Sequence, residues 1–480
     1  MVCARFRKAS RLAKDVFSAI TIEPMLFLNG MALTGSYAPT ENLKLDRYCR
    51  VTLGYPSEVC EKMNDGNHES IQVEVQKRVN LFHFYENLIS SIIPVLLLSF
   101  IATWSDQRGR KVPILLSLFG TTLNSVTYLL VSFFPTWPPE ILYVASFCSS
   151  FGGGWSLFFM AVYSYMSDMS KAEARTKRLA LMKGIWSLGS PAGTALGTLI
   201  YDAGGFCWVF GFSTFLYLLC FFYSLFIIKD NKKLIEQNKE ISKQQRFWNP
   251  KNVVDLFRAC LRKRQGNGRW HIMLLLWLML MIIGTYPHNL YLWVLRVLNW
   301  DINSYSIYKI VDDVGTSISM ICLTPVFVYL RLHDCSVGSM TLVLLFCRLL
   351  AFGMTTSESQ WWVPYVFIFI PVEFVSVAIR SRLSKICDEN ETGRVFAMMA
   401  VLEVFWPIAD SAIFTSVYGA TIENYPSFEH LVGAAFALLA IIGFLGLRLS
   451  LNNDEIQTLK KRIDAEQGRY QTKISAAERS

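Results

Sequence analysis

The sequence is poor in charge, and several patterns that mark soluble enzymes are missing from it. Only 17% of its 480 residues are charged, against about a quarter in an average soluble protein. It contains no HExxH, GxSxG or P-loop pattern, which argues against an enzyme. The eleven cysteines include no CxxC pair, so we predict no metal site and no cofactor. These absences exclude a soluble enzyme and a nucleic-acid-binding domain.

Long apolar blocks take the place of these patterns. Hydrophobic residues make up 52% of the chain, and a membrane-crossing helix needs about 20 residues. The blocks therefore predict an all-α polytopic membrane protein with twelve transmembrane helices. They lie at 16–37, 79–101, 112–134, 140–166, 179–201, 205–228, 270–295, 304–330, 337–354, 361–379, 395–420 and 431–451.

Polar segments divide the twelve blocks into two halves of six. We expect an N-terminal half at 16–228 and a C-terminal half at 270–451, joined by a basic linker at 229–269. Segments 1–15 and 452–480 are predicted to be polar ends. This layout is typical of transporters that bind substrate between two repeated halves near the middle of the membrane.

The distribution of positive charge predicts the orientation. The net charge is +9, and most of the 46 Lys and Arg residues lie in the ends, the linker and the loops after even-numbered blocks. Because such residues stay on the cytoplasmic side, both termini are expected there. Segment 38–78 is then a large extracytoplasmic loop, and its two cysteines, Cys49 and Cys60, are candidates for a local disulfide.

A charged turn, ATWSDQRGRK at 102–111, follows the second block. It resembles the signature loop of the major facilitator superfamily, Gly-x-x-x-Asp-Arg-x-Gly-Arg-Arg/Lys. Gly109 permits a tight turn, and Asp106 can accept hydrogen bonds from a helix N-terminus and from Arg110. Such a turn would act as a cytoplasmic latch that favours one state of a rocking transporter. After the fourth block, we assign to the same latch Asp168 and Arg175.

Three stretches together look like the proton-coupled folate transporter family, a solute-carrier family within that superfamily. They are residues 103–111, 168–178 and 380–421. The resemblance implies a twelve-helix fold and import of small organic anions, often with protons as the coupling ion. It also implies a plasma-membrane or endolysosomal location, of which we expect the plasma membrane.

The sequence differs from this family at several positions that the family uses. An acid in the family's fourth span corresponds to Ser150, a glutamate in its fifth to Lys183, and a histidine in its seventh to Ile282. The arginine of the tenth span is retained as Arg380. A disulfide from the first loop to the loop after the seventh span would require a cysteine at Asn299.

Ionisable residues inside the apolar blocks are costly there, so they are candidates for substrate binding or coupling. Our candidates are Glu23, Glu86, Lys183, Asp312, Asp313, Arg380 and Glu403. Lys183 either pairs with an acid across the bundle or binds an anionic substrate directly. For such a pair the acids considered are Glu23, Glu86 and Glu403.

The other candidates each have two interpretations. The two adjacent aspartates bind a cation or a proton, or else pair with Lys309 or Arg348. Arg380 is a cytoplasmic anchor or holds a carboxylate bidentately, and Glu23 with Pro24 marks a kink or a site. His83, three residues from Glu86 on one helical face, is a pH sensor or an ordinary interfacial histidine.

Three functions are compatible with this organisation. The first is a secondary transporter of a small organic solute that works by alternating access in the lipid bilayer. The second is a transporter-like receptor or scaffold without turnover. The third, a membrane-embedded enzyme, lacks any supporting motif, and we expect no enzymatic activity and no nucleic-acid partner.

Overall fold

The computed structural model describes most of the two predicted halves. The described residues are 21–63, 68–169, 172–230, 258, 260–262, 267–285, 289–330, 334–370, 372–386 and 389–450. The predicted segments 1–15 and 452–480 and most of the linker lie outside these ranges, as does His288. Within the helices, the side chains of four predicted site residues also lie outside the described part, namely those of Asp106, Asp168, Arg175 and Lys183.

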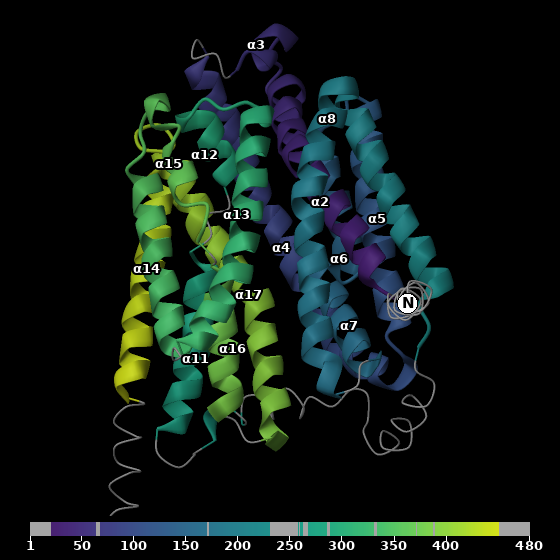
Figure 1. Ribbon diagram of the computed structural model, residues 1–480. Coiled ribbons are helices and arrows are strands. Elements are labelled where there is room, and N and C mark those ends of the chain that lie inside the picture. Colours follow the sequence, from purple (N-terminus) through teal and green to yellow (C-terminus); the bar gives the residue numbers. More distant parts are fainter. Residues whose placement is uncertain are drawn as a thin grey trace, which may run out of the picture.

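The N-terminal half is built from helices that run up and down in succession (Figure 1). Its elements are α2 (Glu23–Arg47), η1 (Tyr48–Thr52), α3 (Ser57–Glu61), α4 (Glu69–Arg108), α5 (Lys111–Phe133), η2 (Pro139–Ile141), α6 (Leu142–Phe151), α7 (Gly154–Met169) and α8 (Ala172–Ile227).

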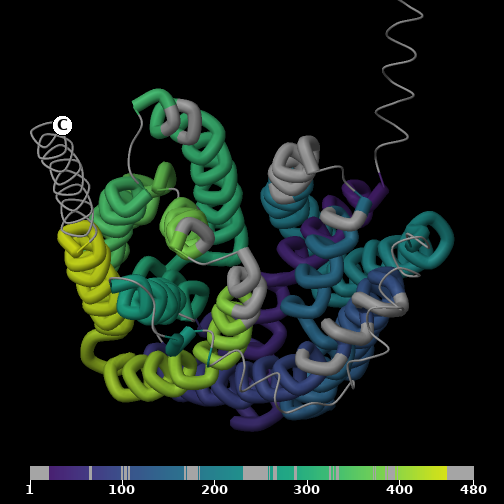
Figure 2. The backbone as a smooth tube through the Cα atoms, turned by 90° about the horizontal axis from the view of Figure 1, so that it is seen from below, coloured from purple at the N-terminus to yellow at the C-terminus, as the bar shows by residue number. Residues whose placement is uncertain are grey.

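The C-terminal half repeats this pattern beside it. Its elements are α11 (Gly268–Ile283), α12 (Leu290–Val297), α13 (Ile302–Tyr329), α14 (Asp334–Gly353), η3 (Glu358–Gln360), α15 (Val363–Val366), α16 (Glu373–Ile386), α17 (Glu389–Thr421) and a last helix, Phe428–Ser450. Seen from below, the two halves form two separate groups of helices (Figure 2).

The described helices group into the twelve predicted crossings once their breaks are taken into account. Seven helices are long and apolar enough by themselves to cross a membrane. One of them, Gly184–Ile227, contains the fifth and sixth crossings, because Gly205 reverses the chain with a φ of 69°. Of the four crossings outside these seven helices, the seventh and tenth are each divided between two shorter helices, and the first and eighth are the more polar α2 and α13. The twelve-helix fold predicted from the sequence is therefore confirmed.

Segment 38–78 differs from the prediction of a single large loop. Helix α2 continues to Arg47 and α4 begins at Glu69, so helix occupies both ends of the segment. Polar composition indicates a loop only when the polar groups face water. Here Glu41 and Lys44 are buried between helices, and their pairing allows the helix to continue.

The predicted kink at Glu23 and Pro24 is also different. Glu23 is the first residue of α2, and Pro24 lies in the first turn. Proline is tolerated at that position because the first backbone N–H groups of a helix have no partner within the helix. These two residues therefore begin the helix.

The hydrophobic cores show where the two halves join. One core contains residues of both halves, among them Leu43, Phe82, Trp293 and Tyr308, and lies at the end of the molecule that carries α3. A second core is built from residues of the C-terminal half only and a third from the N-terminal half only. The halves thus share a core at the α3 end, while each has a core of its own elsewhere.

Candidate functional site

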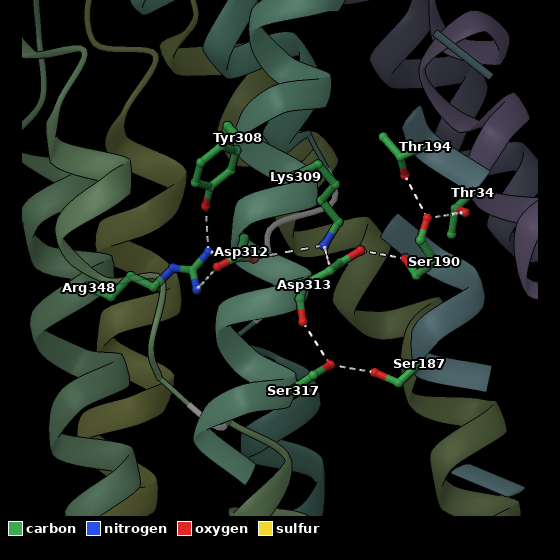
Figure 3. Close-up of polar contacts among 10 residues, drawn as sticks. All are labelled: Thr34, Ser187, Ser190, Thr194, Tyr308, Lys309, Asp312, Asp313, Ser317 and Arg348. Atoms are coloured by element: carbon green, nitrogen blue, oxygen red, sulfur yellow. Dashed lines mark hydrogen bonds and ion pairs between the residues drawn. The ribbon is translucent and has the colours of Figure 1, made fainter. Parts of the chain in front are cut away.

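A network of charged side chains lies near the middle of α13 (Figure 3). Arg348 of α14 contacts Asp312 through Nη1, 3.2 Å from Oδ1, and donates through Nη2 to the Tyr308 hydroxyl at 2.7 Å. Lys309 lies one helical turn before Asp313, with Nζ 2.7 Å from Oδ1, and 3.9 Å from Asp312. Of the two interpretations of the aspartates, the structure shows the pairing one, with both basic residues taking part.

The same network of side chains reaches across to the other half. Ser190 of α8 donates from its hydroxyl to Asp313 Oδ2 at 2.5 Å. One turn away, the hydroxyls of Ser187 and Ser317 lie 2.7 Å apart. Thr34 of α2 donates to the Ser190 carbonyl at 2.9 Å, which ties α2 to this point. Asp313 is therefore shared between a lysine of its own helix and a serine of the opposite half.

Close backbone packing places Ser190 at this position. On either side of it in α8, Gly189 and Gly193 face α2, and a Cβ atom at Gly189 would lie 2.7 Å from the Phe27 carbonyl oxygen. Small residues allow two helices to approach until their backbones touch. Gly189 and Gly193 are thus packing residues.

Arg380 and Glu403 form a separate pair within the C-terminal half. Arg380 Nη2 donates to Glu403 Oε1 at 2.7 Å, and the two side chains are 43% and 25% exposed. This pair joins α16 to α17. Two of our candidates thus contact each other and are not part of the network around Asp312 and Asp313.

Glu23 does not project toward the other candidates. Its Oε2 accepts from the backbone N–H groups of Thr21 and Ile22, at 2.7 and 2.9 Å. It therefore satisfies backbone donors where α2 begins, which is a structural role.

Glu86 belongs to a second buried cluster, nearer the α3 end. Lys44 Nζ lies 3.0 Å from Glu41 Oε1 and 2.8 Å from Glu86 Oε2, and Ser146 donates to Glu86 Oε1 at 3.0 Å. His83 Nε2 lies 2.8 Å from Glu41 Oε2. The basic partner of Glu86 is thus Lys44, a residue that the sequence analysis placed in a loop.

The predicted latch contains an acid that the sequence analysis did not select. Asp230, three residues after α8, accepts from the backbone N–H groups of Arg110 and Lys111 at 2.8 and 3.0 Å. Gly109 has a φ of +105°, and a Cβ there would collide with the Asp230 carboxylate. A carboxylate at the N-terminus of α5 is stabilised by the helix dipole, so Asp230 holds this turn against the end of α8.

Replacing Asp230 with asparagine is expected to lower thermal stability modestly. The neutral amide keeps one acceptor oxygen but loses the charge that favours a helix N-terminus, a loss of about 0.3–1 kcal/mol. Asp202→Asn is the matched control, because Asp202 is an exposed aspartate within helix α8. Equal melting temperatures for the two variants in detergent would contradict the role given to Asp230.

Several functional residues were missed, for two reasons. Ser190 and the hydrogen-bonded pair of Asn80 and Asn289, 3.0 Å apart, are uncharged, so a search for ionisable groups inside apolar blocks passes over them. Glu41 and Lys44 were missed because their segment was assigned to a loop. The spacing of Glu41 and Lys44, three residues apart with opposite charge, was the available signal.

Cys49 and Cys60 form a disulfide that joins η1 to α3, with their Cα atoms 5.9 Å apart. Arg50 reinforces this corner by contacting Glu61 at 3.1 Å. The disulfide therefore fixes the short connection between α2 and α4 at the end of the molecule where the two halves share a core.

Comparisons with known proteins agree with this architecture. Residues 87–409 match the Major Facilitator Superfamily, and the chain belongs to that family. It is a membrane transporter and not an enzyme: it moves a small solute across the bilayer by secondary transport.

Individual relatives cover most of the chain. It is 26% identical to the lysosomal proton-coupled steroid conjugate and bile acid symporter of Homo sapiens, over 90% of this chain and 95% of that protein. It is 20% identical to the probable peptidoglycan muropeptide transporter of Drosophila melanogaster, over 88% and 84%. It is 21% identical to the proton-coupled folate transporter of Rattus norvegicus, over 88% and 90%. The resemblance to the folate transporter family is thereby confirmed.

Solved structures share the fold at low sequence identity. The D-xylose-proton symporter covers 88% of this chain with a TM-score of 0.61 at 13% identity, and 96% of its own chain is matched. The human organic anion transporter MFSD10 gives a TM-score of 0.58 at 14% identity, with 88% of this chain and 98% of that chain covered.

Proposed function

We propose that the protein is a proton-coupled symporter of small organic anions and that it binds the anionic group at Lys309. The observation that carries this proposal is the position of Lys309. Its side chain is 35% exposed, whereas Asp312 and Asp313 are 12% and 17% exposed. Lys309 is thus the most accessible cation of the network of charged side chains that joins the two halves.

An anion at Lys309 would act on the contact between the halves. Asp313 accepts from Lys309 and from Ser190. A substrate carboxylate or sulfate that takes the place of Asp313 at Lys309 leaves Asp313 to Ser190 alone. Substrate binding in one half thereby changes the strength of a bond to the other half, which is what alternating access requires.

The relatives support the substrate class and the coupling ion. The cargoes in their names, steroid conjugates, bile acids, folates and muropeptides, are carboxylates or other organic anions. Two of the three names also state that transport is coupled to protons. We therefore place this chain among proton-driven anion symporters, without assigning it one of these cargoes.

Uptake into proteoliposomes tests this proposal. Labelled taurocholate, a steroid sulfate, folate and a muropeptide are offered with an inward proton gradient, and then with a protonophore that removes the gradient. We expect at least one of these anions to accumulate only when the gradient is present. Binding of an anion without accumulation would contradict symport, as would accumulation that is indifferent to the gradient.

Lys309→Gln is expected to raise the half-saturation concentration of the transported anion by about 10- to 100-fold. A hydrogen bond to a charged group contributes about 1.5–3 kcal/mol, and 1.4 kcal/mol corresponds to a factor of ten. Lys77→Gln is the control, because Lys77 is an exposed lysine that is paired with Glu423 at 2.5 Å. An unchanged half-saturation concentration in Lys309→Gln would remove Lys309 from the site.

We propose that both termini face the cytoplasm. The distribution of Lys and Arg supports this orientation, and so does the Cys49–Cys60 disulfide, because disulfides persist on the oxidising side of a membrane. Epitope tags at the two ends should bind antibody only after the membrane is permeabilised. Antibody staining of intact cells would contradict the cytoplasmic placement of the tagged end.

The sequence prediction is the plasma membrane, whereas the human relative is named as a lysosomal symporter. We propose the plasma membrane as the first location to test. Surface biotinylation of the tagged protein in its native cells measures the fraction at the cell surface. Co-localisation with a lysosomal marker, with no biotinylated fraction, would contradict the plasma-membrane location and indicate the lysosomal membrane.

A further inference from the structure

His83 forms the centre of the buried cluster near the α3 end. On one side its Nε2 lies 2.8 Å from Glu41 Oε2 of α2, in its own half. On the other side its Nδ1 lies 3.3 Å from Asn289 Oδ1, between α11 and α12 in the opposite half. Only 8% of His83 is exposed. The imidazole is therefore a buried link between the two halves.

The orientation of the Asn289 amide is set by its other neighbours. Its Nδ2 donates to Asn80 Oδ1 at 3.0 Å and to Glu429 Oε2 at 3.3 Å. The Asn80 amide is fixed in turn, because its Nδ2 donates to the Thr415 backbone carbonyl at 2.8 Å. Reversing either amide would bring oxygen against oxygen. The carbonyl oxygen of Asn289 therefore faces His83.

Both ring nitrogens of His83 thus face oxygen atoms. A carbonyl oxygen accepts and cannot donate, so Nδ1 must carry a hydrogen. Nε2 and Glu41 Oε2 lie 2.8 Å apart without an aligned hydrogen bond. A ring whose only hydrogen is on Nδ1 would place its partly negative Nε2 against the carboxylate, whereas a doubly protonated ring would attract it. A neutral imidazole supplies only one of these two hydrogens. These two contacts therefore favour a His83–Glu41 pair that holds one proton more than the neutral ring would bring.

The charges around the pair agree with this count. The four groups in direct contact are Glu41, Glu86, Lys44 and His83. With the additional proton their formal charges sum to zero, and without it the cluster carries one uncompensated negative charge. An unpaired charge in a buried site is strongly destabilising, so closure of this end around the cluster favours the protonated pair.

We infer that His83, together with Glu41, is the site that binds the coupling proton, and that binding it closes the α3 end of the transporter by joining His83 to Asn289. This inference rests on the proposed proton symport and gives it a location. Loss of the proton removes one of the two hydrogens, so that either the contact within the half or the contact between the halves is lost. Proton binding and closure are then one event.

Other ionisable groups surround His83 and its partners, and each is part of the same electrostatic environment. From the elements packed here they are Tyr37, Glu41 and Lys44 of α2, Glu86 of α4, Tyr128 of α5, Tyr291 of α12, and Glu429 and His430 of the last helix. Glu429 reaches His83 only through Asn289. Among these described groups, Glu41 is the one in direct contact with His83, which itself reaches the opposite half through Asn289.

Cross-linking across the α3 end tests the inference in the full-length protein. Lys77 of α4 and Glu423, just after α17, lie in contact at the rim of this end, one in each half. In a Lys77→Cys/Glu423→Cys variant, the rate of disulfide formation reports closure. This rate is first corrected for the pH dependence of thiol reactivity. We expect it to be higher at about pH 5 than at about pH 8, by at most about tenfold per pH unit, because one proton is involved.

Two substitutions of His83 represent its two states. Arg carries a permanent charge and several N–H donors, so His83→Arg is expected to cross-link fast at every pH. Gln cannot gain a proton, so His83→Gln is expected to cross-link slowly at every pH. Asn87→Ala is the matched control. It removes another hydrogen bond between the halves, to Ser411 at 3.1 Å, that involves no titratable group, and it should keep the pH dependence.

A pH dependence that persists in both His83 variants would overturn the inference, as would one that is absent from the parent pair. Comparing the Arg and Gln variants with each other excludes a simple folding defect, because they should shift in opposite directions. Uptake assays separate this outcome from the proposed function. Proton-driven uptake that persists in the His83 variants would place the coupling proton elsewhere and leave symport itself intact.

Discussion

Replacing Arg348 with methionine is expected to lower the stability of the protein by about 3–5 kcal/mol, the cost of removing one partner from a buried ion pair. Arg348 is 13% exposed, contacts both carboxylate oxygens of Asp312, donates to Tyr308 and lies over the Phe352 ring at 5.2 Å. After the substitution, Asp312 keeps Lys309 only at 3.9 Å. The melting temperature in detergent and the yield of monodisperse protein measure the loss.

Arg380→Met provides the matched comparison. It also breaks an arginine–carboxylate pair in the C-terminal half, but Arg380 is 43% exposed, and exposed pairs contribute about 0–1 kcal/mol. The double variant Asp312→Asn/Arg348→Met removes both charges and should recover most of the lost stability. Similar melting temperatures for the two single variants would show that burial does not control the strength of these pairs.

Gly193→Leu is expected to prevent α2 and α8 from packing and to leave little folded protein. A Cβ at Gly193 would overlap the backbone of Met31 and the Thr34 hydroxyl, and two helix backbones cannot yield as a flexible side chain can. Overpacking of a tight interface costs about 1–3 kcal/mol or more. Displacement of α8 would also move Ser190 away from Asp313, so any folded fraction should transport poorly.

Gly184→Leu is the control for this prediction. Gly184 lies in the same helix, and nothing lies within 4 Å of the position that its Cβ would occupy. Because leucine favours helix more than glycine does, the substitution should leave the yield of folded protein unchanged or slightly higher. Comparable losses of folded protein in both variants would mean that α8 is sensitive to any added side chain.

The charged candidates illustrate how far the sequence leads. Asp312 and Asp313 were found because charge is costly inside an apolar block, and Lys309 is three and four residues before them in the chain. A helix places such residues on one face, so the lysine pairing follows from spacing alone. The arginine pairing does not, because Arg348 lies on another helix, and which two helices meet is a property of the tertiary structure.

Glu86 and Lys44 illustrate the opposite case. The sequence placed Glu86 inside a helix but gave Lys44 to a loop, since a polar stretch between two apolar blocks reads as solvent-exposed. In the structure each of these charges is compensated by the other at 2.8 Å, so a polar helix can be buried. The pairing of Lys44 with Glu86 joins two helices, so the sequence shows only the three-residue spacing of Glu41 and Lys44 within one helix.

The amino-acid sequence is enough to give the membrane class and the twelve crossings, because these depend on how many apolar residues follow one another. It also determined the family through short motifs. The tertiary structure was needed to show which charges pair between helices, that Asp230 holds the turn after α4, and that Asp313 and His83 link the halves. The contacts of Asp230, Asp313 and His83 across the molecule join residues more than one hundred positions apart, and the charge pairs between helices join residues 23 or more positions apart. Helix packing, and not local order, sets the geometry of these contacts.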